Sequence, residues 1–243
     1  LLSASFTLLA FHATAQPATG RLLATAEAAY EADQLDSALV QVQRIILVDP
    51  SSAQAFKLRG DIHQRQHRLD DAMADYRTSE DLDDGNARLY VSRSALHITK
   101  GNAQGGLRDA NKALDLDPGD ADAWYNRAWA LYQGNDLDAA LKSVRKALEV
   151  APRFPEALYL SGVIKGAQYN EAEGVEEINQ ALHLNPAIPG GLMSMAVLLY
   201  EGKRYQEAIP KFTEVIATDT TELADAYYFR ADCHYNLGNK EQA

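Results

Sequence analysis

The spacing of two histidines raises the question of a metal site. His63 and His67 lie four residues apart in one predicted helical segment, a spacing that lets two imidazoles face the same metal ion. A zinc site needs three or four ligands, and the sequence offers no third ligand near this pair. The helical phase instead places His63 on the packing face and His67 at a turn. We therefore expect no metal site here.

Acidic side chains gather at two places, residues 80–84 and 115–122, and could hold a cation. Neither cluster has the spacing and the glycine of a calcium-binding loop. A carboxylate at the start of a helix accepts hydrogen bonds from free amides and interacts favourably with the helix dipole. We expect this role for four residues that fall at predicted helix starts: Asp120, Asp122, Glu156 and Asp225.

The sequence contains no glycine-rich phosphate loop, no nucleophile elbow and no placed Ser/His/Asp set. Cys233 is the only cysteine, so neither an intrachain disulfide nor a cysteine-based metal site can form. From these absences we expect a non-enzymatic protein without a cofactor or a bound metal.

Composition narrows the class of partner. The 243 residues are 47% hydrophobic, which is enough to bury a large core. The 34 acidic and 23 basic residues give a net charge of −11. Binding a phosphate backbone or an anionic membrane needs a basic face, so this balance argues against both partners.

The first residues differ from the rest of the chain. Residues 1–11 (LLSASFTLLAF) are apolar and uncharged, too short to span a bilayer, and are followed by the small-x-small sequence Ala13-Thr14-Ala15. This pattern predicts a signal peptide over residues 1–15 and a linker over residues 16–18. The protein would then be exported, to the periplasm or the medium of a bacterium. The alternative is a buried N-terminal helix.

The remaining chain has a period of 34 residues. The endings Val48-Asp49-Pro50, Leu116-Asp117-Pro118, Val150-Ala151-Pro152 and Leu184-Asn185-Pro186 share one phase. Internal repeats of this length indicate stacked supersecondary units. Taking the last residue of each ending as the thirty-second of its unit, the units begin at Thr19, Ala53, Ala87, Ala121, Pro155, Pro189 and, after a one-residue insertion, Ala224.

The eighth and twentieth places of the units carry only small residues. All fourteen are Ala, Gly or Ser, although these types make up only 66 of the 243 residues. Two antiparallel helices can pack closely only where small side chains let the backbones approach. The pattern therefore predicts helical hairpins with two recurring contact points, closed by prolines that stop the second helix.

Residues 121–152 (ADAWYNRAWALYQGNDLDAALKSVRKALEVAP) resemble a tetratricopeptide repeat (TPR), and the resemblance extends over residues 19–243. It implies an all-α fold, a right-handed α-α superhelix of about six and a half helix-turn-helix repeats with the last one truncated. It also implies a scaffold or adaptor that binds protein or peptide segments.

In this family the first helix of each pair lines a concave groove. Carried over residue by residue, the groove is polar in the first two units and apolar and aromatic from the third unit onward. The resemblance thus implies these partner-binding residues: Val91, Ile98, Tyr125, Trp129, Tyr132, Tyr159, Val163, Met193, Val197, Tyr200 and Tyr228.

Four members of this set carry the sharper hypothesis. We expect Trp129, Tyr159, Val163 and Met193 to hold an extended or helical apolar segment of a partner, because tryptophan is enriched at interface hot spots. For Tyr125 and Tyr132 an equally good interpretation is that they support packing within the hairpins.

Two other functions stay open. The array stops inside its seventh unit, whereas solenoids normally end in a polar capping helix. It could therefore be the accessory region of a longer enzyme or sensor whose catalytic domain lies beyond residue 243. A small apolar ligand in the groove is the other alternative, although such ligands usually need a more enclosed pocket.

Overall fold

The computed structural model describes residues 19–218, 223–239 and 241, and the predicted signal peptide and linker lie outside these residues. The described chain is helical, with turns between the helices and no strand. A helix over residues 19–31 comes first. It is followed by α2 (Leu35–Val48), α3 (Ala53–Arg65), α4 (Leu69–Leu82), α5 (Ala87–Thr99), α6 (Ala103–Leu116), α7 (Ala121–Gln133), α8 (Leu137–Val150), α9 (Pro155–Ala167), α10 (Glu171–Leu184), α11 (Gly191–Glu201), α12 (Tyr205–Thr218) and α13 (Leu223–Asn236).

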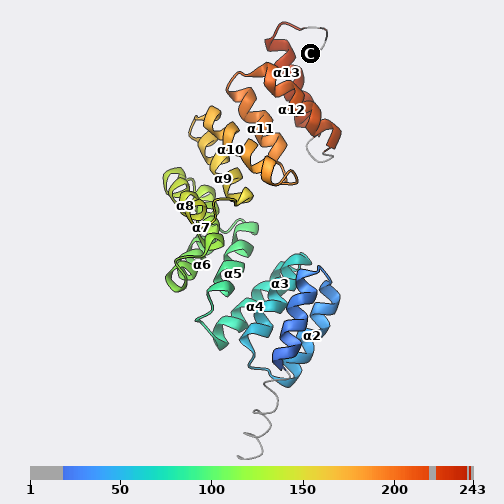
Figure 1. Ribbon diagram of the computed structural model, residues 1–243, viewed down its shortest axis with the longest axis vertical. Helices are drawn as coiled ribbons and strands as arrows, with labels where there is room; N and C mark the ends of the chain where they lie inside the picture. Colours follow the sequence, from blue (N-terminus) through green and yellow to red (C-terminus); the bar gives the residue numbers. More distant parts are fainter. Residues whose placement is uncertain (1–18, 219–222, 240, 242–243) are drawn as a thin grey trace, which may run out of the picture.

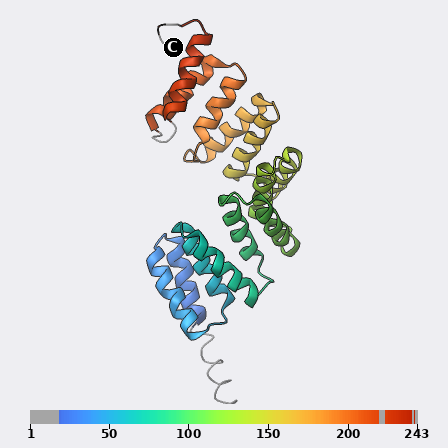
Figure 2. The same cartoon turned by 180° about the vertical axis from the view of Figure 1, so that it is seen from behind.

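The helices form antiparallel hairpins that stack in chain order into one elongated array, with the two ends of the described chain far apart (Figure 1). The view from behind shows the same order without any crossing of the chain back along the array (Figure 2). The expected all-α superhelical repeat fold is confirmed.

Local chemistry explains where the helices begin. The side chains of Ser52 and Asp120 accept hydrogen bonds from the backbone amides three residues on, which starts α3 and α7. Pro155 occupies the first turn of α9, where its missing N–H costs nothing. One start differs from the 34-residue phase: α11 begins at Gly191, two residues after Pro189, because Gly190 is left-handed with φ 68°.

Each hairpin turn contains one residue with a left-handed backbone. The amide that follows it donates back into the helix, as Asp136 does to the Leu131 carbonyl at 2.9 Å, and so ends the first helix of the pair. The left-handed residues recur with the period of the array: Asp33, His67, Gly101, Asn135, Tyr169, Lys203 and Gly238. The last step is 35 residues, which matches the one-residue insertion before the seventh unit.

The two small positions bring the helices of each pair together. In the hairpin of α9 and α10, a Cβ on Gly162 would lie 2.7 Å from the Gly174 carbonyl oxygen. In the hairpin of α5 and α6, the buried Ser94 hydroxyl donates to the Gly106 carbonyl at 2.8 Å. Larger side chains at these places would force the helices apart, so the small residues set how closely the two helices of a hairpin approach.

The core consists of separate clusters along the array, as expected when each unit packs only on its neighbours. Leu160 and Ile164 of α9 pack with Val144 of α8 in one cluster. Ile178 and Phe212 belong to the next, which reaches from α10 to α13. No single centre holds the fold together.

Arginines at the seventh place of three units add a polar tie to this core. Arg59 donates to Asp75, and Arg93 donates to Asp109, each across its own hairpin. Arg127 does the same with the Ser143 hydroxyl. In all three the partner lies 16 residues further on, which is the separation of facing positions in the two helices.

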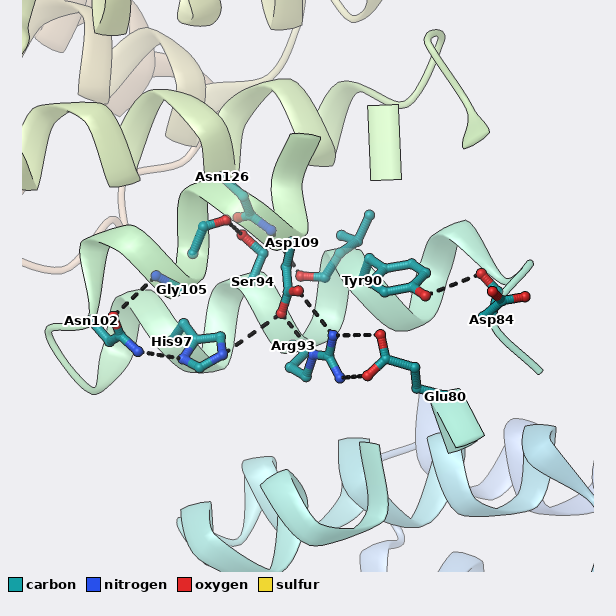
Figure 3. Close-up of polar contacts among 12 residues, drawn as sticks. Glu80, Asp84, Tyr90, Arg93, Ser94, His97, Asn102, Gly105, Asp109 and Asn126 are labelled. Carbon is teal, nitrogen blue, oxygen red and sulfur yellow. Dashed lines mark hydrogen bonds and ion pairs between the residues drawn. The ribbon is translucent and has the colours of Figure 1, made fainter. Parts of the chain in front are cut away.

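Arg93 also joins two hairpins. Its guanidinium lies between Asp109 on α6 and Glu80 on α4, so one cation binds both carboxylates (Figure 3). Its side chain is only 10% exposed. The hydrogen bond from Arg93 is the main reason that the pKa of Glu80 is lowered. At the other end of the same junction, Lys100 bonds Asp70 at 2.6 Å.

The close approach within a hairpin can be tested with a matched pair of Gly→Ala variants. Gly162→Ala should lower the free energy of unfolding by about 2 kcal/mol, because the new methyl group meets a backbone carbonyl that cannot move aside. Gly20→Ala, in a helix with nothing within 4 Å, should raise it by about 0.5 kcal/mol. Urea unfolding followed by circular dichroism measures both, and equal effects would contradict the explanation.

The junction between α4 and α5 makes a second prediction. Arg93→Met should destabilise the chain by about 3 kcal/mol, because Asp109 would be left buried without its cation. Arg204→Met removes a partner of the exposed Glu207 and should have no measurable effect on urea unfolding. A small loss for Arg93→Met would mean that the bridge is not needed to hold the two hairpins.

Candidate binding groove

The first helices of the hairpins form the inner face of the array. Contacts join α3 to α5, α5 to α7, α7 to α9, α9 to α11 and α11 to α13, whereas no such contacts join the described second helices to one another. The second helices therefore splay apart on the outside, and the array curves around the first helices. This is the face on which the groove residues were predicted.

Hydrogen bonds between residues 35 apart hold neighbouring first helices side by side. Asn126 donates to the Val91 carbonyl at 2.9 Å, and Gln133 donates to the Ile98 carbonyl at 3.1 Å. The Tyr159 hydroxyl lies 2.9 Å from the Ser194 hydroxyl. These bonds fix the spacing between α5 and α7 and between α9 and α11.

The inner face opens into a cavity of about 650 Å³ between α7, α9 and α11, which we call the first cavity. Four of the predicted groove residues lie in its wall: Tyr132, Val163, Met193 and Val197. Tyr169 in the turn between α9 and α10, Glu171 at the start of α10 and Glu201 of α11 also line it. Sequence reasoning missed Tyr169 and Glu171, because it considered only the helical positions that line the groove.

A second cavity of about 540 Å³ lies between α3, α5 and α7. Val91 and Tyr125 of the predicted set line it. The other walls carry charged and amide side chains: Asp61, Gln64, Arg65, Asp122 and Asn126. The wall of the second cavity thus carries more charged side chains than the wall of the first.

Trp129 is bound within its own aromatic cluster and lines neither of these cavities. Its indole N–H donates to the Tyr125 hydroxyl at 2.7 Å, and its ring meets Tyr132 edge-on at 5.6 Å. Tyr125 packs on Phe154 with ring centroids 5.1 Å apart, and burial raises the pKa of Tyr125 to about 12. Of the four residues expected to act together, Val163 and Met193 share the first cavity, whereas Trp129 and Tyr159 are not in its wall.

The remaining predicted residues are spread along the array. The Tyr200 hydroxyl donates to Asp232 at 2.8 Å, and this bond is the main reason that its pKa is raised to about 12. Tyr228 is 66% exposed with its ring edge-on to Phe229. Ile98 is partly buried beside the Gly106 backbone.

The two histidines that raised the question of metal binding are parts of the hairpin structure. His63 is buried between α3 and α4, 3.6 Å from Asp75, and His67 is the left-handed residue of the turn. Among the described residues no group of three metal-binding side chains occurs. Cys233 is buried, and burial raises the pKa of its thiol to about 11.

The His63 environment predicts how stability depends on pH. Burial, helped by Arg68, lowers the pKa of His63, while its Nδ1 atom has no hydrogen-bond partner. The unfolded chain binds a proton near pH 6.5 and the folded chain resists it, so stability should fall as the pH drops from 7 to 5.5. His63→Gln should flatten this slope, and the exposed His183→Gln should not. Urea midpoints across this range measure it, and an unchanged slope in His63→Gln would contradict the assignment.

No helix in the part of the chain that the structure describes is long and apolar enough to cross a membrane. No curated protein matches the chain. Several solved structures share its fold at low sequence identity. PilW, a widely conserved type IV pilus biogenesis factor, is 15% identical with a TM-score of 0.76, over 86% of this chain and 97% of that one.

PilF of Pseudomonas aeruginosa is 18% identical with a TM-score of 0.67, over 80% of this chain and 88% of that one. YrrB, a TPR protein with an unusual peptide-binding site, is 19% identical with a TM-score of 0.57, over 76% and 97%.

Family models described as tetratricopeptide repeat match residues 23–87, 121–154 and 195–243, which together make up more than half of the sequence. The helix pairs, the small residues at their contacts and the turns that recur every 34 residues agree with these matches. The matches show that the chain belongs to the tetratricopeptide repeat family.

Proposed function

We propose that the chain is a non-enzymatic scaffold that is exported to the periplasm or the medium and binds segments of partner proteins on its inner face. TPR proteins bind protein or peptide partners. The observation that carries the proposal for this chain is the first cavity, which gives a continuous face of helices an apolar hollow large enough for side chains of a partner.

The predicted groove residues support the same site. Val163, Met193 and Val197 come from two neighbouring hairpins, and their apolar side chains meet in one wall. An exposed apolar hollow in an otherwise charged surface typically marks an interaction site. Among the structural neighbours, PilW is a pilus biogenesis factor and YrrB has a peptide-binding site. Export is consistent with the leader-like residues 1–15.

Site-specific photo-cross-linking in the native cell tests this function. A photoreactive amino acid at Val197, in the cavity wall, should form covalent adducts with partner proteins. The same amino acid at Arg145, on the exposed face of α8, should form none. Fractionation of the cells should recover the adducts outside the cytoplasm. Adducts at both positions alike, or at neither, would contradict binding on the inner face.

The aromatic cluster around Trp129 allows a quantitative test of the proposed binding. Trp129→Ala should weaken binding of a cross-linked partner by more than about 1 kcal/mol, because it removes the indole that orders Tyr125 and Tyr132 beside the cavity. Lys146→Ala on α8 is the control and should leave affinity unchanged. Isothermal titration with the purified partner measures both, alongside thermal unfolding to show that each variant is folded.

A further inference from the structure

One residue of the first cavity is strained and exposed at once. Tyr169 has φ 62°, in the left-handed region that disfavours any side chain with a Cβ other than those of Asn and Asp. At this position two other turns use Asp33 and Asn135, which tolerate this conformation, and two use glycine. His67 and Lys203 adopt it in two further turns. A tyrosine here costs stability that the fold could avoid.

The Tyr169 side chain is too exposed for packing to offset this strain. It is 89% exposed, the most exposed large apolar side chain that the structure describes. No hydrogen bond or ring contact joins it to another described residue. The turn needs a left-handed residue but not a tyrosine, and side chains held in strained conformations are typical of binding sites. Tyr169 lies in the turn between α9 and α10, where it forms part of the wall of the first cavity.

The charges around this cavity indicate what occupies it. Glu171 and Glu201 lie in its wall, and neither forms an ion pair or hydrogen bond with any residue that the structure describes. Nearby acidic residues do find cations: Lys165 binds Glu173 and Glu177, and Arg204 binds Glu207. No basic residue lines the cavity. Two free carboxylates around an apolar hollow, on a chain of net charge −11, favour a cationic partner.

We propose that Tyr169 is kept in this exposed position to close over a partner segment in the first cavity, and that the segment carries an apolar side chain flanked by lysine or arginine. The proposal rests on the proposed function and adds the chemistry of the partner. The apolar side chain enters between Val163, Met193 and Val197. The flanking cation meets Glu171 or Glu201 and the face of the Tyr169 ring, which attracts cations.

A random peptide library displayed on phage, selected on the purified chain, tests the chemistry of the partner. Enriched peptides should carry a large apolar residue with lysine or arginine within a few positions, and their binding should weaken with salt. Glu171→Gln together with Glu201→Gln should lower their affinity. Enrichment of acidic or uncharged peptides, or no enrichment, would overturn the proposal. The proposal would also be overturned if the chain self-associated in sedimentation and the enriched peptide blocked that association, because the occupant would then be a second copy of the chain.

A matched pair of variants tests Tyr169. Tyr169→Asn should raise the midpoint of thermal unfolding by about 2 °C, because Asn tolerates the left-handed backbone, yet weaken the enriched peptide at least about fivefold. Lys203→Asn makes the same change in the next turn, outside the cavity wall. It should raise stability alike and leave affinity intact. Unchanged affinity in Tyr169→Asn, or an equal loss in Lys203→Asn, would refute the role.

These results separate the two proposals. Cross-links from Val197 to a partner, together with peptides that ignore Tyr169 and the two glutamates, would leave the inner face as a binding site and reject only the present inference. Absence of any cross-link from the inner face would reject the proposed function itself.

Discussion

The close approach of the two helices in each hairpin is the constraint on which the rest of this structure depends. Gly162 and Gly174 bring α9 and α10 together so tightly that no Cβ fits between them and the facing backbone. Every hairpin has a small residue at the same two places, so its two helices approach closely. This recurring approach places the first helices side by side, and bonds between residues 35 apart can then form between α5 and α7 and between α9 and α11. The groove is a consequence of this regularity.

Polar contacts decide how the hairpins are joined where the apolar clusters are small. Arg93 binds Glu80 and Asp109 at once, so the second and third hairpins share a cation as well as a core (Figure 3). The bridge joins the two hairpins whose first helices, α3 and α5, line the second cavity. Buried arginine pairs are demanding, since removal of either partner leaves an unpaired charge. The relative placement of these two hairpins therefore depends on few side chains.

The apolar half of the groove shows how a regular scaffold acquires individual chemistry. The turn geometry is the same in every hairpin, yet its left-handed residue is Asn135 in one and Tyr169 in the next. The scaffold accepts the strained tyrosine because the turn is held by backbone bonds on both sides, such as Asn170 to the Lys165 carbonyl. A surface turn can thus carry a recognition residue without disturbing the packing below it.

The repeat and the helical hairpins could be predicted from the sequence alone, because the 34-residue period and the small residues at two places in each unit depend on spacing within one unit. The superhelix and the groove positions, among them Val163, Met193 and Val197, came from the resemblance to the tetratricopeptide repeat. Only the tertiary structure decided which nominated side chains are free. The Trp129 indole N–H donates to the Tyr125 hydroxyl, and the Tyr200 hydroxyl donates to Asp232. Exposure and hydrogen bonding depend on side chains from neighbouring units, which a spacing pattern within one unit does not specify.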